Sequence, residues 1–561
     1  MTWKNIKKPL FFVGCGILIA AAFAGIELLI FSGLPLEHKK TILGAFRTDP
    51  DVNGEYYSRS ATENGCHLGL ITFNYSKWRF VLDGVPGTAF EGITMPSAVA
   101  PELDRYFSPD GRHTAYGAKN DGQFFVVMDG TPGPKFDDLE FPIFSPDGKH
   151  MAYAGLKNGQ WQTFRDGIPG QEFDNIHSLI FSPDGKHLAY QASRDKHNYV
   201  VLDEAASAPC DGVLKKGIIF SPDSNHLAFA EKTGSKFCVV RDNVPGPMFD
   251  GIGDGTLKFS PDSRRLGYAG QVGNRWVAVV DGVLSVECDS LDGHDPVFSP
   301  IGPHVAWVAK IDSQHVFVQL DGKSGPDYSQ ISAPIFGPVT GRFAYVAKKD
   351  DRWQMVVDGI AGSSYFAIAI PGPIFSPNGR RVAYMAQKDT KVQIVVDGQA
   401  GPESDSAEKP IFSPDSQHVA YIAVSGGIWH VFLDGKPDVS FDEIDKTSLC
   451  FSPDGRHLAY WAKTGKQWQV IMDGKPGPAF NEFLKGKIIF SNNGKHFAYP
   501  ASKGSQSMVV VDGISGPAFS ELLVGPVVCR DGHLEYMAKE GDYPHENIVR
   551  VKVPRFSSSL P

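Results

Sequence analysis

The sequence predicts an all-β protein built from about thirteen copies of one four-stranded unit. A phrase that begins with an aromatic residue and continues Ser-Pro-Asp-Gly recurs through the chain of 561 residues. The aromatic residues follow one another at intervals of 37 to 39 residues, which indicates one supersecondary unit copied many times. Gly-containing turns separate the short apolar runs of each copy, as in β-hairpins. The anchor aromatics are Phe107, Phe144, Phe181, Phe220, Phe259, Phe298, Phe336, Phe375, Phe412, Phe451 and Phe490, and Val528 stands in the place of a twelfth.

One copy, residues 142–167, shows the expected strands in order. Residues 143–144 lead into the Ser-Pro-Asp-Gly turn, and residues 151–154 follow it as a second strand. Residues 161–164 form a third strand after an Asn-Gly turn, and a short run such as residues 135–137 of the preceding copy supplies a fourth. Helical repeats are excluded because every unit carries Pro and several Gly.

A four-stranded unit of about 38 residues, repeated in tandem, is typical of β-propeller blades. A degenerate earlier copy at residues 64–84 brings the total to 12–13 blades. Propellers typically close with about four to eight blades, so we expect two tandem propellers. The expected domains are residues 59–310 and 311–554, followed by a disordered tail at 555–561. A single large ring is the alternative.

A membrane anchor is expected at the N-terminus. A basic cytoplasmic segment, residues 1–9, precedes an apolar stretch at 10–34 that is long enough to cross a bilayer as a helix and is interrupted by Glu27. The alternative is a cleaved signal peptide, because residues 22–24 have the small-x-small form of a cleavage site. Residues 35–58 would be a linker. We therefore expect a single-pass protein of the cell membrane whose repeats face the periplasm or the exterior.

The composition excludes some partners. The chain has 54 basic and 63 acidic residues and a net charge of -9, so it has no basic field for a nucleic-acid backbone. Its seven cysteines do not recur at one repeat position, and no paired Cys-x-x-Cys spacing suggests zinc.

The recurrent polar and aromatic residues are interpreted as structural. The position two residues after the turn is His in ten copies but Arg in three, and Arg can neither ligate a metal nor act as a base. The Asp of each closing Asp-Gly pair suits a two-residue hairpin turn. Six Trp residues share one strand position, which indicates packing between blades. The Arg copies are Arg265, Arg342 and Arg381, and the Trp residues are Trp78, Trp161, Trp276, Trp353, Trp429 and Trp468.

One candidate metal site lies outside the repeats. Asp49, Asp51 and Asn53 match the opening of a calcium loop, where alternating oxygens surround a hard cation. The twelfth position is Ser60, so the bidentate Glu of such loops is missing, and a solvated turn is the preferred interpretation. The sequence contains no nucleophile elbow, P-loop or zincin motif. We therefore expect no cofactor and no enzymatic activity.

The Phe-Ser-Pro-Asp-Gly-Lys-x-Leu-Ala-Tyr phrase, as in residues 181–190, resembles the WD-like β-propeller repeat of TolB-type periplasmic proteins, and the resemblance covers roughly residues 60–550. It implies an exported propeller that binds other proteins in the cell envelope. Related blades also occur as accessory domains of peptidases. The chain differs from the TolB pattern because it has about twice the blades and lacks the small α/β domain expected before them.

Taken together, these features predict a non-enzymatic scaffold that is anchored in the cell envelope and binds a protein or peptide on its loop face. Partner-binding candidates are residues where the repeat rule breaks. Glu204 and Asn243 replace the Gly of the Asp-Gly turn in neighbouring copies, and Tyr365 opens an apolar loop. The alternatives are a propeller enzyme, or a module that binds polysaccharide or a small ligand, acting at the central channel.

Overall fold

The computed structural model describes residues 106–528, except for 292–295, 313–314, 370–371, 482–483 and 485. It also describes strands or short segments at 27–28, 39–45, 55–61, 68–74, 77–82, 85–94, 533–540, 547–553 and 556. All regular elements within these residues are β-strands, which confirms the predicted all-β class. None of the described segments forms a helix that is long and apolar enough to span a membrane. Apart from Glu27 and Leu28, which form β1, the expected anchor at 10–34 lies outside the described residues.

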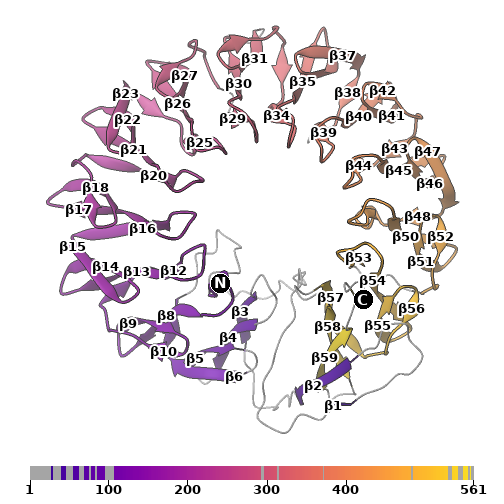
Figure 1. Ribbon diagram of the computed structural model, residues 1–561, viewed down its shortest axis with the longest axis horizontal. Coiled ribbons are helices and arrows are strands. Elements are labelled where there is room, and N and C mark those ends of the chain that lie inside the picture. Colours follow the sequence, from indigo (N-terminus) through magenta and orange to yellow (C-terminus); the bar gives the residue numbers. More distant parts are fainter. Residues whose placement is uncertain are drawn as a thin grey trace, which may run out of the picture.

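The strands form thirteen antiparallel sheets among the described residues, and we call each sheet a blade. In chain order they are blade 1 (β3–β6), blade 2 (β7–β10), blade 3 (β11–β15), blade 4 (β16–β19), blade 5 (β20–β23), blade 6 (β24–β28), blade 7 (β29–β32), blade 8 (β33–β37), blade 9 (β38–β42), blade 10 (β43–β47), blade 11 (β48–β52), blade 12 (β53–β56) and blade 13 (β57–β59 with β2 and β1). Consecutive strands pair, so each blade is a meander whose first strand lies inside the ring and whose fourth strand lies outside (Figure 1).

The first strands are short and are split in several blades. Their bounds are β3 Glu55–Ala61, β7 Gly92–Ile93, β11 Asp138–Leu139, β12 Ile143–Phe144, β16 Asn175–Phe181, β20 Gly212–Phe220, β24 Gly251–Ile252, β25 Lys258–Phe259, β29 Val297–Phe298, β33 Gln330–Ile331, β34 Ile335–Phe336, β38 Ala367–Ile368, β39 Ile374–Phe375, β43 Ser406–Ala407, β44 Ile411–Phe412, β48 Glu443–Ile444, β49 Cys450–Phe451, β53 Ile489–Phe490 and β57 Glu521–Val528.

The second and third strands form the long central hairpin of each blade. Their bounds are β4 Leu68–Asn74 and β5 Lys77–Leu82, β8 Ala115–Asn120 and β9 Gln123–Met128, β13 Met151–Lys157 and β14 Gln160–Arg165, β17 Leu188–Arg194 and β18 His197–Leu202, β21 Leu227–Thr233 and β22 Lys236–Arg241, β26 Leu266–Val272 and β27 Arg275–Val280, β30 Val305–Lys310 and β31 Val316–Leu320, β35 Phe343–Lys349 and β36 Arg352–Val357, β40 Val382–Lys388 and β41 Lys391–Val396, β45 Val419–Ser425 and β46 Ile428–Leu433, β50 Leu458–Thr464 and β51 Gln467–Met472, β54 Phe497–Lys503 and β55 Gln506–Val511, and β58 Leu534–Glu540 and β59 Asn547–Val553.

The fourth strands form the outer wall of the ring. Their bounds are β6 Val85–Phe90, β10 Thr131–Pro132, β15 Ile168–Phe173, β19 Ala205–Ala206, β23 Val244–Phe249, β28 Val283–Leu284, β32 Lys323–Ser324, β37 Ile360–Tyr365, β42 Gln399–Ala400, β47 Lys436–Phe441, β52 Lys475–Pro476 and β56 Ile514–Ser515. In blade 13 this place is taken by β2 Lys39–Ala45, with β1 Glu27–Leu28 beyond it.

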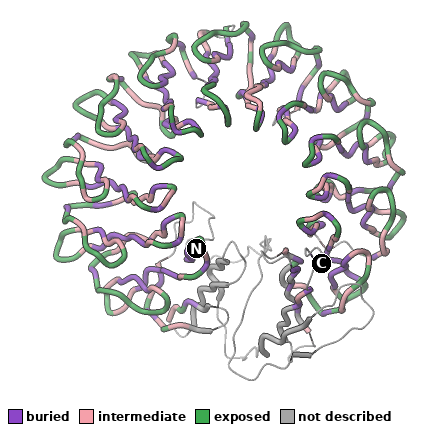
Figure 2. The backbone as a smooth tube through the Cα atoms, in the orientation of Figure 1, coloured by how far each residue is buried: buried purple, intermediate pink, exposed green. Residues whose placement is uncertain are grey.

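The hydrophobic core lies between blades. Ala152 and Ala154 of β13 pack with Phe173, Leu188 and Tyr190 in one buried cluster that joins blades 3 and 4. The second strands are buried on both faces, which explains why they read as continuous apolar runs rather than as alternating sequences. In blades 3 to 12, buried residues follow the middle of each blade, while the outer turns are exposed (Figure 2). The six recurrent Trp residues all pack against such clusters, as predicted.

The thirteen blades follow one another around a single ring (Figure 1). The boundary expected between residues 310 and 311 falls between β30 and β31, inside blade 7. Packing also continues beyond this point, because Val308 and Val318 of blade 7 share a buried cluster with Tyr345 of blade 8. Among the described residues, the blades therefore continue past the expected boundary and do not separate there. The reason is that every interface repeats the same apolar packing, so no blade presents an edge at which a first propeller would close.

The last blade is completed by strands from both ends of the chain. The N-terminal strand β2 pairs antiparallel with β59, in the register Lys39↔Lys552 to Ala45↔Asn547. The linker expected at 35–58 thus contains β2 and the first part of β3. The tail expected at 555–561 contains Phe556, which is fully buried in the core of the last blades. Both corrections have one cause, since segments from the two chain ends complete the last sheet and its core.

Candidate functional site

One face of the ring, here called the turn face, collects two turns from each of blades 3 to 12. In blade 3 these are the Ser-Pro-Asp-Gly turn between β12 and β13 and the Asp-Gly turn between β14 and β15. In an up-and-down meander both turns reach the same end of the blade. Asp166 and Gly167 adopt left-handed φ angles of 50° and 79°, the geometry that two-residue hairpin turns require.

The Ser-Pro-Asp-Gly turn is held by its own side chains. Ser145 Oγ donates to Asp147 Oδ1 at 2.6 Å and accepts from the backbone N–H of His150 at 2.9 Å. The hydrogen bond from Ser145, followed by that from the backbone N–H of Lys149, lowers the pKa of Asp147 to about 2. A Cβ added at Gly185 in the next blade would lie 2.6 Å from Asp147 Oδ1, so successive turns stack closely around the ring.

The recurrent His residues pair with the Asp of the hairpin turn. The Nδ1–H of His150 donates to Asp166 Oδ2 at 2.7 Å, and the backbone N–H of Met151 donates to Asp166 Oδ1 at 2.9 Å. The prediction of a structural role for these residues is confirmed, because the same pair holds the two turns of many blades together. The further pairs are His113–Asp129, His187–Asp203, His226–Asp242, His304–Asp321, His418–Asp434, His457–Asp473 and His496–Asp512.

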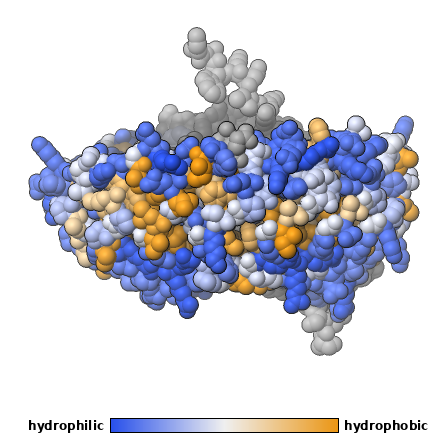
Figure 3. Space-filling model, turned by 90° about the horizontal axis from the view of Figure 1, so that it is seen from above, coloured by the Kyte–Doolittle hydropathy of each residue, from blue (hydrophilic) through white to orange (hydrophobic). Residues whose placement is uncertain are grey.

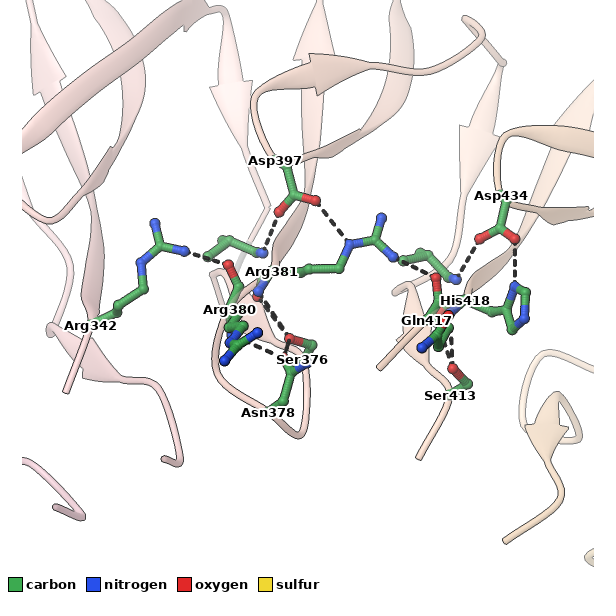
Figure 4. Close-up of polar contacts among 12 residues, drawn as sticks. Arg342, Ser376, Asn378, Arg380, Arg381, Asp397, Ser413, Gln417, His418 and Asp434 are labelled. Carbon is green, nitrogen blue, oxygen red and sulfur yellow. Dashed lines mark hydrogen bonds and ion pairs between the residues drawn. The ribbon is translucent and has the colours of Figure 1, made fainter. Parts of the chain in front are cut away.

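The three Arg copies add a bond to the next blade. Arg381 Nε donates to Asp397 Oδ2 at 2.9 Å, and its Nη1 donates to the carbonyl oxygen of Gln417 in blade 10 at 2.7 Å (Figure 4). Arg265 and Arg342 bond in the same way to the carbonyl oxygens of Pro303 and Arg380. An Arg at this position therefore links neighbouring blades as well as neighbouring turns.

A cleft opens on the turn face between blades 8 and 9. Its volume is about 390 Å³. Its polar lining includes Arg342, Asp358, Arg380 and Asp397, and its apolar lining includes Met355 and Tyr384. Arg342 Nε donates to Asp358 Oδ2 at 2.7 Å, so this pair is neutral as a whole. Sequence reasoning missed this cleft because its lining comes from two copies of the repeat and forms no local motif.

Glu204 lies between blades 3 and 4, where it binds its own chain. Its Oε2 accepts from the backbone N–H of Gln171 at 2.7 Å, and its Oε1 accepts from the hydroxyl of Tyr190 at 3.3 Å. Its backbone oxygen accepts from the Gln171 side chain at 2.7 Å. Glu204 therefore already has hydrogen-bond partners at the blade interface.

Asn243 and Tyr365 have different environments. Asn243 is exposed and has a φ of 63° in the hairpin turn of blade 5, the position that Glu204 holds in blade 4. These two candidates thus share one face in neighbouring blades. Tyr365 lies at the end of β37 in blade 8, is 5% exposed and packs edge-to-face against Tyr384, with 6.3 Å between ring centroids. A buried ring cannot offer a partner surface, so we assign Tyr365 to the core.

No cluster of three His, Cys, Asp or Glu residues suitable for a metal ion occurs in the described ranges. The calcium candidates Asp49, Asp51 and Asn53 lie outside those ranges. Burial raises the pKa of the Cys210 and Cys238 thiols to about 11 each, so both are protonated, buried groups.

Exposed aliphatic side chains gather on the outer wall of blades 5 and 6. Val244 and Met248 of β23 are 67% and 55% exposed, and Val283 of β28 is 73% exposed, with Leu284 and Val286 beside it in sequence. We call these five residues the outer apolar patch. Seen edge-on, the ring carries apolar side chains in a belt between two hydrophilic margins (Figure 3). An aliphatic residue directly follows the hairpin turn at Val244 and Val283, but also at Ile168 and Ile360, so the sequence carries no signal that is specific to this patch.

The comparisons with known proteins concern the fold. No family model and no curated protein matches the chain. The chain is similar to the crystal structure of a eukaryotic initiation factor, at 15% identity, 59% coverage of this chain, 96% of that chain and a TM-score of 0.28. It is similar to TolB from Acinetobacter baumannii, at 13% identity, 52% and 80% coverage and a TM-score of 0.21. It is also similar to the β-propeller domain of the Trilobed protease from Pyrococcus furiosus, at 12% identity, 54% and 94% coverage and a TM-score of 0.21.

The fold is a β-propeller. Its thirteen radial meanders, the last of them formed by strands from both chain ends, define the architecture by themselves. The similar structures have identities of 12% to 15%, so they are not used to assign an activity or a partner.

Proposed function

We propose that this protein is a non-enzymatic β-propeller scaffold, anchored in the cell envelope by residues 10–34, which binds a protein partner on the outer wall next to the turn face. The outer apolar patch carries this proposal. Large aliphatic side chains that remain exposed on the outer strands of two successive blades are typical of protein interaction surfaces. Full burial of one such side chain contributes on the order of 1.5 to 3 kcal/mol.

The position of the patch also supports the proposal. Val244 directly follows Asn243, one of the turn residues at which the repeat rule breaks. The patch lies on fourth strands, which are the outermost strands of their sheets and leave one edge open. An open edge can pair with an extended segment of a partner, and the aliphatic side chains would then pack against that segment.

The test is site-specific photo-crosslinking in cells that express the full-length chain with a crosslinker at position 284. We expect one discrete crosslinked partner, lost when Val244→Glu and Val283→Glu are combined. The matched control is Ile168→Glu, because Ile168 holds the same strand position in blade 3 and is 71% exposed. Equal crosslinking by the double variant and the control would refute the proposed surface.

The anchor has a separate test. Membranes that contain the full-length chain are extracted at alkaline pH and are compared with membranes from cells that express residues 35–561. We expect the full chain to stay with the membrane and the shorter chain to be released. Release of the full chain, or its recovery without residues 1–24, would contradict the anchor and favour a cleaved signal peptide.

A further inference from the structure

Two blade interfaces hold a carboxylate that belongs to the chain itself. Between blades 3 and 4, Glu204 accepts from the backbone N–H of Gln171 and from the Tyr190 hydroxyl. Between blades 10 and 11, Asp438 Oδ1 accepts from the backbone N–H of Val439 at 2.8 Å, and its Oδ2 accepts from the Tyr460 hydroxyl at 2.7 Å.

The two carboxylates come from opposite sides of their interfaces. Glu204 belongs to the hairpin turn of the second blade, whereas Asp438 belongs to the outer strand of the first blade. The donors are nevertheless the same. One is a backbone N–H beside a register shift of the outer strand, and the other is the Tyr hydroxyl of the second strand of the next blade. The interface therefore has a defined place for a carboxylate.

The cleft between blades 8 and 9 has the same two donor positions. It has no carboxylate at the position equivalent to Glu204 or at the position equivalent to Asp438. Gly362 stands where Asp438 stands, and Gly398 stands where Glu204 stands. Ser363 provides the N–H at the equivalent register shift, and Tyr384 lines the cleft. A Cβ at Gly362 would lie 4.0 Å from the Tyr384 hydroxyl, whereas a Cβ at Gly398 would meet no atom within 4 Å.

The charges around this cleft favour an anion. Arg342 pairs with Asp358, and Arg381 pairs with Asp397 at 2.9 Å. Arg380 also lines the cleft, is exposed, and forms no ion pair with any of the residues that the structure describes. One positive charge is therefore left over at the cleft. Burial, followed by the neighbouring Tyr365 hydroxyl, raises the pKa of Tyr384 well above its ordinary value, so the Tyr384 hydroxyl stays protonated.

Two nearby interfaces leave the hydroxyl of the equivalent Tyr without an acceptor. The hydroxyls of Tyr421 and Tyr499 hold the equivalent position at the interfaces of blades 9 and 10 and of blades 11 and 12. Both are buried and have no hydrogen-bond partner in the described part of the chain. A buried hydroxyl without a partner is unfavourable, and an incoming acceptor would remove that cost.

We propose that the cleft between blades 8 and 9 binds the carboxylate of an Asp or Glu side chain of a protein partner, in the place that Glu204 and Asp438 fill elsewhere. The inference rests on the proposed role of the protein as a scaffold. Ser363 N–H and the Tyr384 hydroxyl bind the carboxylate oxygens, and Arg380 supplies the charge. Met355 contacts the methylene groups of the side chain.

The test is isothermal titration calorimetry on the full-length chain in detergent. The probes are the peptide acetyl-Ala-Ala-Glu-Ala-Ala-amide, its Gln counterpart, and glutarate as a free small acid. We expect the Glu peptide to bind at least tenfold more tightly than either of the other probes. Equal affinity for the Gln peptide would overturn the carboxylate site, and equal affinity for glutarate would overturn the assignment to a protein side chain.

Variants locate the binding. Gly362→Asp places a tethered carboxylate in the cleft, as Asp438 does between blades 10 and 11. It should lower the affinity for the Glu peptide at least tenfold. Arg380→Gln leaves the cleft open and should lower the affinity for the Glu peptide about fivefold. Gly325→Asp is the matched control between blades 7 and 8, because a Cβ there lies 3.9 Å from the Tyr345 hydroxyl, and it should change nothing. Unchanged binding by Gly362→Asp refutes the site, and crosslinking at position 284 still reports on the scaffold proposal.

Discussion

The carboxylate of Asp166 joins two turns of one blade, because Oδ2 accepts from the Nδ1–H of His150 at 2.7 Å while Oδ1 accepts from the backbone N–H of Met151 at 2.9 Å. Asp166 and His150 contribute differently to these hydrogen bonds. The Asp satisfies a backbone donor and a side-chain donor at once, whereas the His satisfies the Asp alone. The Asp position should therefore tolerate fewer changes than the His position.

Asp166→Ala should lower stability, because it leaves the Met151 N–H and the imidazole without their acceptor. Loss of hydrogen bonds of this kind costs about 1 to 3 kcal/mol. His150→Arg should be tolerated, since Arg holds this position in three blades. Urea unfolding followed by circular dichroism measures both effects. A larger shift of the midpoint for His150→Arg than for Asp166→Ala would contradict this assignment.

Arg381→His should weaken the link between blades 9 and 10 while keeping the turn of blade 9. The imidazole can still pair with Asp397, but it cannot reach the Gln417 carbonyl that Arg381 Nη1 contacts at 2.7 Å. We expect a loss of about 1 kcal/mol. Amide hydrogen exchange at the interface of blades 9 and 10 should become faster in Arg381→His. In His418→Arg, exchange at the interface of blades 10 and 11 should become slower. Equal exchange in both variants and the parent chain would show that the Arg bond has no effect on the interface.

The repeat period predicted most of the structure of one blade. It did not determine how many blades follow one another in a ring. The spacing of the anchor residues located the turns, and the alternation of His and Arg revealed a structural role for that position. The continuation of the blades past blade 7 was not predictable, because the interface between blades 7 and 8 uses the same residue types as the others. The curvature of the ring depends on how these side chains fill each interface, which the period does not encode.

The candidate sites were predicted less well, for a physical reason. Glu204 was noticed because it replaced a turn Gly, but its actual partners are a backbone N–H and a Tyr hydroxyl from different copies. Tyr365 stood out because its loop is apolar, and its aromatic side chain is buried. The carboxylate place between blades combines a register shift with a Tyr one blade away, and neither leaves a local motif in the sequence.

The turn aspartates should make the fold sensitive to acid. The Ser hydrogen bond is the main cause that lowers the pKa of Asp147 and of its equivalents. Such a carboxylate stabilises the fold at every pH above its unfolded pKa of about 3.9, and this contribution is lost as the pH falls through its folded pKa. The equivalents are Asp110, Asp184, Asp223, Asp262, Asp415 and Asp454.

We therefore expect the thermal midpoint to fall steeply between about pH 4 and pH 2, the latter being the folded pKa of Asp147. The combined variant Asp147→Asn, Asp184→Asn and Asp223→Asn should flatten this fall, because Asn does not titrate. The chain already uses Asn378 after Ser376, with Ser376 Oγ 2.8 Å from Asn378 Oδ1, so the substitution fits the turn. An unchanged pH profile in the triple variant would show that other groups cause the acid sensitivity.

Removal of β2 should leave the last blade with an unpaired edge. In the intact chain β2 pairs with β59, so the C-terminal sheet is completed by the N-terminal strand. A chain without residues 1–45 would expose the backbone donors and acceptors of β59, and an unpaired edge of this kind recruits strands from other molecules. We expect concentration-dependent oligomers in analytical ultracentrifugation. Deletion of residues 1–24 alone leaves β1 and β2 in place and is the matched control. A monomeric chain without residues 1–45 that unfolds at the same temperature as this control would show that the ring does not depend on the β2–β59 pairing.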